Sequence, residues 1–108
     1  MRDDKPEYIL CAAIWYEDLP LKKEFDSNVR PVNCDKGLVF CGFRHPHCMY
    51  SMSSVTGLRS VESEVGKYTQ GFLTSKNRFV DRKEAALIAF DRGQVKGVFD
   101  KLLSEYLY

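Results

Sequence analysis

The sequence predicts a single α+β domain that spans residues 1–108. Two apolar segments rich in branched and aromatic residues are typical of buried strands. Further along the chain, a hairpin pattern leads directly into a capped helix, and a proline marks the start of another helix. Since the chain is close to the usual size of one domain, we expect these elements to share one core.

The N-terminal half contains the two predicted core strands. Tyr8–Tyr16, with the sequence YILCAAIWY, is the first, and Leu38–Gly42, LVFCG, is the second. The segment Glu17–Lys36 between them is polar, holds two prolines and has no clean period. We therefore expect a long connection there, with a short edge strand at Val29–Val32. Gly37 indicates a turn just before the second strand.

A helix is expected to begin at Pro46, whose missing N–H costs nothing in a first helical turn. Gly57 is a suitable C-terminal stop for this helix. The polar segment that follows, residues 58–67, is expected to be a loop or the end of the helix. Helical spacing predicts an apolar face made of Met49, Met52 and Val55.

The region after residue 67 predicts a hairpin. Tyr68–Thr74 and Arg78–Val80 have the composition of two paired strands. The three residues that connect them end in Asn77, which tolerates the left-handed conformation that such loops need. The chain therefore reverses direction within this short stretch.

The hairpin is followed by the clearest helix signal in the chain. Asp81 and Glu84 stand three residues apart, which is typical of an N-cap and its partner. Gly93 is expected to cap the other end. Beyond it, Gly97–Tyr108 is expected to form either a final helix or a strand-like tail. The predicted apolar face of the capped helix consists of Ala85, Leu87, Ile88 and Ala89.

The composition excludes several classes of function. The 16 basic and 15 acidic residues give a net charge of +1, so no overall positive field attracts DNA or RNA polymers. The apolar run Tyr8–Tyr16 is too short to cross a bilayer and lacks the cleavage pattern of a signal peptide. We therefore expect an intracellular protein with no membrane partner. In a reducing compartment we expect free thiols at Cys11, Cys34, Cys41 and Cys48.

Motifs of the common enzyme classes are absent. The chain has no Gly-x-Ser-x-Gly, P-loop, Gly-x-Gly-x-x-Gly or His-Glu-x-x-His. The residue types allow a nucleophile–base pair of Cys48 with His45 or His47. Nothing in the sequence orients that pair, so we expect a protein that is not an enzyme and needs no cofactor.

The first candidate site is the strand-to-helix junction that carries Arg78 and Arg82. Helix N-termini offer free N–H groups and partial positive charge, which suit phosphate. Arginine side chains add bidentate contacts to phosphate oxygens. The alternative is that both arginines form surface salt bridges, for instance with Asp81 or Glu84.

The second candidate is the segment CGFRHPHC, residues 41–48. Its two cysteines and two histidines are residue types that bind zinc, but the spacing lacks a Cys-x2-Cys pair, so we expect no metal. A second reading is a cationic cluster that faces a phosphate or ribose, formed by Arg44, His45 and His47. In a third reading, one histidine caps the helix and the other is solvated.

The third candidate is a set of aromatic residues that flank the two basic junctions. Aromatic faces beside arginines are the elements of a pocket for a base and a phosphate. The alternative is that these side chains are simply buried in the hydrophobic core and bind no ligand. The residues are Phe43, Tyr50, Phe72 and Phe79.

The run QGFLTSKNRFVDRKEAALIAFDRGQ, together with CGFRHPHC upstream, resembles a family of small phage proteins, the first-described Thoeris anti-defence family. Its members sequester a bacterial immune signal, a cyclic ADP-ribose isomer made by TIR-domain enzymes. The resemblance implies an antiparallel sheet flanked by helices. It also implies a homodimer or hexamer in the host cytoplasm, with ligand pockets at the subunit interface.

The resemblance also assigns ligand contacts. It implies that Arg78 and Arg82 contact the ligand and that Tyr50 stacks on its base, with Met49 as the alternative. The predicted ligand-binding residues are Arg44, His45, Tyr50, Phe72, Asn77, Arg78 and Arg82.

The chain departs from the family pattern at Phe43, where an arginine is common, and at Pro46, where a second histidine is common. The function that the resemblance implies is a phage anti-defence sponge that binds the signal without degrading it. Some members also bind cyclic oligonucleotides at a separate site. The alternative function is a protein-interaction module that inhibits a host protein directly, which a large exposed apolar patch would indicate.

Overall fold

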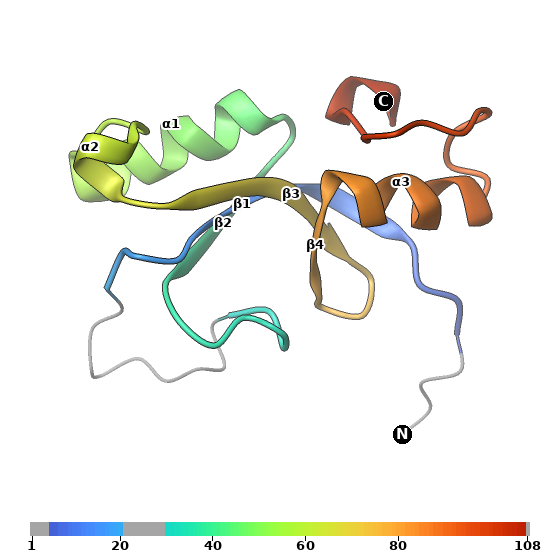
Figure 1. Ribbon diagram of the computed structural model, residues 1–108, viewed down its shortest axis with the longest axis horizontal. Helices are drawn as coiled ribbons and strands as arrows, with labels where there is room; N and C mark the ends of the chain where they lie inside the picture. Colours follow the sequence, from blue (N-terminus) through green and yellow to red (C-terminus); the bar gives the residue numbers. More distant parts are fainter. Residues whose placement is uncertain (1–4, 21–29, 108) are drawn as a thin grey trace.

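The computed structural model describes residues 5–20 and 30–107. An antiparallel sheet of four strands, in the order β2-β1-β3-β4, lies at the centre, and the helices cover one of its faces (Figure 1). The predicted α+β class, with an antiparallel sheet flanked by helices, is confirmed. The elements are β1 Ile9–Tyr16, β2 Leu38–Gly42, α1 His45–Thr56, α2 Glu62–Val65, β3 Tyr68–Thr74, β4 Phe79–Asp81, α3 Arg82–Asp91 and a 3-10 helix at Ser104–Tyr106.

Both predicted strands form, and β1 is a core strand between β2 and β3. The prediction that β2 is also a core strand is wrong, because β2 lies at the edge of the sheet and none of its residues is fully buried. The edge strand expected at Val29–Val32 is wrong for residues 30–32, while Val29 lies outside the described residues. The chain turns there instead, since the Cys34 N–H donates to the Pro31 carbonyl at 3.0 Å. The Val32 N–H then donates to the Asn77 carbonyl at 2.8 Å, which joins this turn to the hairpin loop.

The predicted turn before β2 is confirmed, and only glycine fits it. Gly37 has φ +75°, a left-handed conformation that L side chains rarely adopt. A Cβ atom at this position would lie 2.4 Å from the Tyr16 carbonyl oxygen. Gly37 therefore lets the chain pass close to the end of β1 before it pairs with that strand.

The hairpin and its helix form as predicted. Asn77 has φ 58°, and its N–H donates to the Thr74 carbonyl at 2.9 Å. Asp81 caps α3, because its carboxylate accepts the Glu84 N–H at 2.8 Å. At the other end Gly93 adopts φ 72°, and the N–H that follows it closes the last turn of α3.

The main core fills the space between the helices and the sheet. The predicted apolar face of α1 is wrong at Val55, which is 74% exposed. The buried positions start one turn earlier, with His45, Cys48 and Met52. In α3 the prediction is wrong at Leu87, which lies about 200° around the helix from the buried Ala85 and is 61% exposed. Small side chains bring α3 close to the sheet at Ala85, Ala86 and Ala89.

The C-terminal tail is neither a long helix nor a strand. It runs back over α3 (Figure 1) and forms only the short 3-10 helix. Leu102 anchors it, because its side chain is fully buried and its N–H donates to the Arg82 carbonyl at 2.9 Å.

Residues 58–67, expected as a loop or helix end, contain the one-turn helix α2. No helix in the described part of the chain has the length and apolar character needed to cross a membrane.

Candidate functional site

The strand-to-helix junction places Arg82 at the first position of α3. Its guanidinium turns inward, donating to the Leu102 carbonyl at 3.3 Å and to the Gln70 side-chain oxygen. The same guanidinium lies 3.4 Å from the His45 Nδ1 atom. A cavity of about 230 Å³ opens beside it, lined by Gln70, Asp81, Arg82, Lys83 and Lys101.

His45 is a buried side chain that contacts the Arg82 guanidinium. Only 4% of His45 is exposed, and its Nε2 atom lies 2.7 Å from the Gly71 carbonyl oxygen. A carbonyl only accepts, so Nε2 carries the proton and Nδ1 is free to accept from Arg82. Burial lowers the pKa of His45, which favours this neutral form. His45 therefore positions Arg82 and has little surface to offer a ligand.

The cation of Arg82 is held by neutral acceptors. Among residues 5–20 and 30–107, no carboxylate forms a salt bridge with it. The neighbouring Asp81 directs its carboxylate to the α3 backbone instead. Burial lowers the pKa of Arg82, because a charged guanidinium loses hydration there. An anion that reached this side chain would not have to displace a carboxylate.

Arg78 has the opposite environment. Its guanidinium donates hydrogen bonds to the Glu7 carboxylate at 2.9 and 3.0 Å and to the Glu84 carboxylate at 2.9 Å. Thr74 adds a hydrogen bond to the Glu7 carboxylate at 2.6 Å. Arg78 lowers the pKa of Glu7, and the two carboxylates raise the pKa of Arg78. The salt bridge to Glu84, an alternative open from the sequence, forms, and Arg78 does not line the cavity beside Arg82.

The remaining predicted residues are dispersed. Arg44 lies just before α1, with its guanidinium 4.7 Å from the centre of the Phe43 ring. Tyr50 projects from α1 and is 78% exposed, and Asn77 is exposed in the hairpin loop. Phe72 is fully buried, so its ring offers no open face for stacking, and it packs edge-on against His45 at 5.1 Å. The single chain therefore brings together Arg82, His45 and Phe72.

Three residues of the cavity were not anticipated from the sequence. Lys83 follows Arg82 at the α3 N-terminus, so the phosphate-binding tendency of helix ends could have indicated it. Gln70 and Lys101 come from β3 and from the returning tail. No local pattern predicts that the tail passes over the N-terminus of α3. Three basic side chains and one carboxylate thus line this cavity.

The Cys/His segment does not assemble a metal site within the described residues. No group of three or more His, Cys, Asp and Glu side chains there could hold a metal ion. Cys48 is buried, its thiol donates to the Arg44 carbonyl at 3.5 Å, and burial raises its pKa to about 11. His45 already uses both ring nitrogens, so it does not serve as a base for Cys48.

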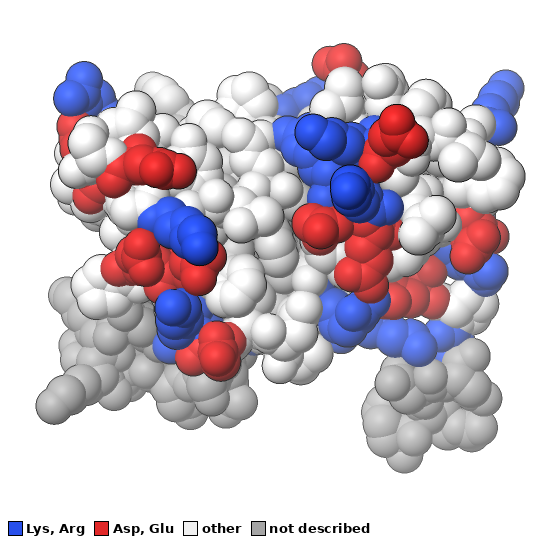
Figure 2. Space-filling model, in the orientation of Figure 1, with Lys and Arg blue, Asp and Glu red and all other residues white. Residues whose placement is uncertain are grey.

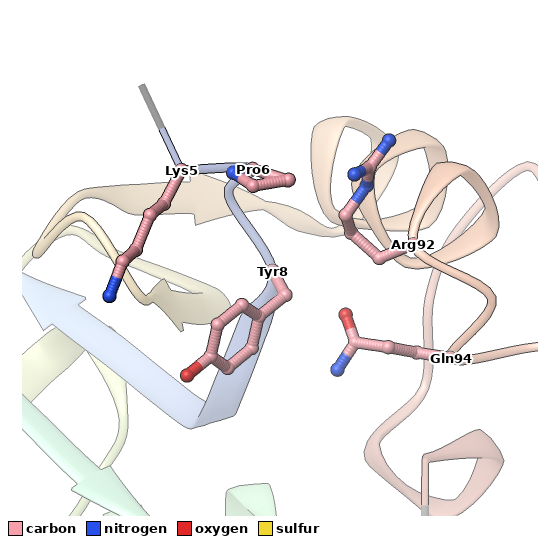
Figure 3. A pocket seen from close by; sticks show the side chains of 5 residues that line it. All are labelled: Lys5, Pro6, Tyr8, Arg92 and Gln94. Atoms are coloured by element: carbon pink, nitrogen blue, oxygen red, sulfur yellow. The ribbon is translucent and has the colours of Figure 1, made fainter. Parts of the chain in front are cut away.

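A second cavity, of about 360 Å³, lies between the N-terminal segment and the end of α3. Figure 3 shows Tyr8 and Lys5 on one side and Arg92 and Gln94 on the other. The amide of Gln94 is occupied, because it exchanges two 2.8 Å hydrogen bonds with the Ile9 backbone. Gln94 therefore joins β1 to the segment that follows α3.

Charge on the surface is mixed. The face in Figure 2 interleaves basic and acidic side chains and has no continuous basic surface. This agrees with the net charge of +1. On this face, positive charge is therefore not gathered into a broad surface of the kind that attracts nucleic-acid polymers.

A comparison with protein families found a match over residues 8–108 to the family described as Phage T4 y16D protein. Comparisons with curated proteins and with solved structures found no match. The family match covers every helix and strand of the fold, together with Arg82 and the other residues of its cavity.

Proposed function

Because the chain belongs to the phage T4 y16D protein family, we propose that it is a phage protein that binds a small signalling nucleotide and withholds it from the host. The signal is a cyclic ADP-ribose isomer made by a TIR-domain enzyme, and the protein acts in the host cytoplasm as an anti-defence sponge. One observation carries the proposal. Arg82 is a partly buried cation, held by neutral acceptors, at the edge of a cavity that also contains Lys83 and Lys101.

The pyrophosphate is the part of the ligand that this cavity suits. Arg82 offers a planar fork to phosphate oxygens, and the two lysines add mobile positive charge. The N-terminus of α3 contributes a partial positive charge in the same place. Asp81 does not cancel this arrangement, because its carboxylate accepts from the backbone of α3.

The size of the cavity suggests that a second copy of the chain completes the site. Pockets for drug-sized ligands usually measure about 300–1,000 Å³. The cavity beside Arg82 measures about 230 Å³ and suits the phosphates alone. We therefore propose a homo-oligomer in which a neighbouring copy closes over the base and ribose. Exposed Tyr50 is available for such a contact.

Arg78 has a supporting part in this proposal. It holds Glu7 and Glu84, and a ligand would have to compete with both carboxylates to reach it. We assign the first phosphate contact to Arg82, and we assign to Arg78 the attachment of the N-terminal segment to the hairpin. Binding alone is sufficient for sequestration, so the proposal assigns no acid, base or metal to the site.

Isothermal titration with cyclic ADP-ribose isomers tests the site. We expect Arg82→Gln to weaken binding by about 10- to 100-fold, the loss of one or two charge-assisted contacts. Arg59→Gln is the matched control, because Arg59 is an exposed arginine paired with Glu64 and lies outside the cavity. Unchanged binding in Arg82→Gln, or an equal loss in Arg59→Gln, would remove Arg82 from the site.

A direct inhibitor of a host protein is the second candidate, and one observation favours it. Tyr50 and Val55 on α1 are large apolar side chains that are 78% and 74% exposed. A contiguous exposed apolar patch marks a protein-binding surface, and this candidate requires that these two side chains contribute to one. A pull-down from host lysate that recovers one stoichiometric protein from the wild type, but not from Tyr50→Ser, would favour this function over the sponge.

A further inference from the structure

Two cysteines meet on the face of the sheet opposite the helices. Cys41 of β2 pairs in register with Ala13 of β1. Cys11 lies two positions from Ala13, so its side chain points to the same face and is the diagonal neighbour of Cys41. Cys41 is exposed and Cys11 is partly exposed, so reagents in solution can reach both thiols.

The surroundings of Cys11 and Cys41 differ from those of the other two thiols, Cys34 and Cys48, and so do the causes of their pKa shifts. The Cys41 thiol hydrogen-bonds to the Cys11 sulfur, and with help from the Gly42 backbone this lowers the pKa of Cys11 to about 7. The same contact raises the pKa of Cys41. Burial raises the pKa of Cys34 and of Cys48 to about 11. The Cys11–Cys41 pair is therefore the place where a neighbouring thiol stabilises a thiolate, and the thiolate is the reactive form.

We propose that Cys11 and Cys41 are an oxidation site, in which a peroxide converts the two thiols into a disulfide that links β1 to β2. Four cysteines are free in the structure, and only this pair combines access with a thiol neighbour. The site is independent of the proposed nucleotide function, because it lies on the opposite face of the sheet from Arg82 and its cavity.

The reaction takes place in two steps. The Cys11 thiolate attacks one peroxide oxygen, so that an S–O bond forms, the O–O bond breaks and the departing oxygen takes a proton. For hydrogen peroxide this gives the Cys11 sulfenic acid and water. The Cys41 sulfur then attacks the Cys11 sulfur, and an S–S bond replaces the S–O bond. The Cys41 proton leaves with the hydroxyl as a second water, and the two sulfurs have supplied the two electrons that reduce the peroxide.

Peptide mapping after treatment with hydrogen peroxide tests the proposal directly. Trypsin places each of the four cysteines in a different peptide, and Cys41 lies alone in residues 37–44. We expect a dithiothreitol-sensitive peptide that joins Cys11 to Cys41, while Cys34 and Cys48 stay available for alkylation after unfolding. Oxidation of Cys11 without any link to Cys41, or equal reaction at Cys34 and Cys48, would overturn the proposal.

Alkylation kinetics test the thiol contact without oxidation. In Cys41→Ala, we expect iodoacetamide to modify Cys11 near pH 7 roughly tenfold more slowly, because the thiolate fraction of Cys11 falls when its pKa returns toward about 8.5. Cys34→Ala is the control, because that thiol makes no contact that lowers the Cys11 pKa. Circular dichroism establishes that both variants fold. An unchanged Cys11 rate in Cys41→Ala would contradict the pairing.

Discussion

The contact between Glu7 and Arg78 joins residues 71 positions apart, and its removal has a measurable cost. Arg78 donates two hydrogen bonds to the Glu7 carboxylate, and Thr74 donates a third. Glu7→Gln keeps the size of the side chain and removes its charge. We expect this variant to fold, with a weaker attachment of the N-terminal segment to the hairpin.

The structure sets the size of the effect. A buried hydrogen bond to a charged group contributes about 1.5–3 kcal/mol, and an exposed ion pair about 0–1 kcal/mol. Arg78 retains 33% of its side-chain surface, so solvent screens part of the interaction. We therefore expect Glu7→Gln to lower the free energy of unfolding by about 1–2 kcal/mol, or the thermal midpoint by roughly 4–10 °C.

The effect should depend on pH with a defined sign. Arg78 lowers the pKa of Glu7 in the folded protein. The stabilisation is therefore complete above the unfolded-state pKa of about 4.3 and is lost as the pH falls through the lower folded-state value. Urea unfolding should separate wild type from Glu7→Gln at neutral pH, and the difference should shrink in acid as wild-type Glu7 is protonated.

Glu64→Gln supplies the control for this prediction. Glu64 makes the same kind of contact, but its partner Arg59 is highly exposed. We expect Glu64→Gln to leave the unfolding midpoint almost unchanged. An equal effect of the two substitutions, or a difference for Glu7→Gln that persists at low pH, would refute the reasoning.

Two further predictions concern single positions in the fold. Gly37→Ala should lower the free energy of unfolding by about 1–3 kcal/mol in a denaturant titration, because the new Cβ meets the Tyr16 carbonyl at a left-handed position; an unchanged midpoint would contradict the tight turn. Burial lowers the pKa of His45, so the wild type should lose thermal stability as the pH falls below the unfolded-state value of about 6.5. His45→Gln should show a smaller loss between about pH 7.5 and 5.5 in melting curves, and an equal loss would exclude His45 as its source.

Local structure could be predicted because its signals lie close together in the chain. Asp81 and Glu84 are three residues apart and define the start of α3, and Gly93 defines its end. Gly37 and Asn77 take the left-handed conformations that their residue types favour. Each of these features depends on the conformation of a few consecutive residues, so the sequence specifies it without knowledge of the tertiary fold.

The site was harder to predict because its charges meet over long distances in the sequence. From local spacing, Arg78 and Arg82 look equivalent. Glu7 comes from 71 residues away to neutralise Arg78, and the tail returns to place Lys101 beside Arg82. Hydrophobic periodicity and helix-capping residues predict neither of these long-range contacts. The distinction between an arginine paired with carboxylates and one held by neutral acceptors is therefore a property of the tertiary fold.

The availability of Arg82 to an anion is most directly tested by signal capture and release. The protein is incubated with the cyclic ADP-ribose signal from a TIR-domain enzyme, the mixture is filtered to remove free signal, and the retained protein is denatured by heat. We predict that wild type removes the signal from the filtrate and releases it intact, whereas Arg82→Gln leaves a larger share of the signal in the filtrate at the same protein concentration. Signal that stays in the filtrate with the wild type, or that is recovered as a degradation product, would contradict sequestration at this site.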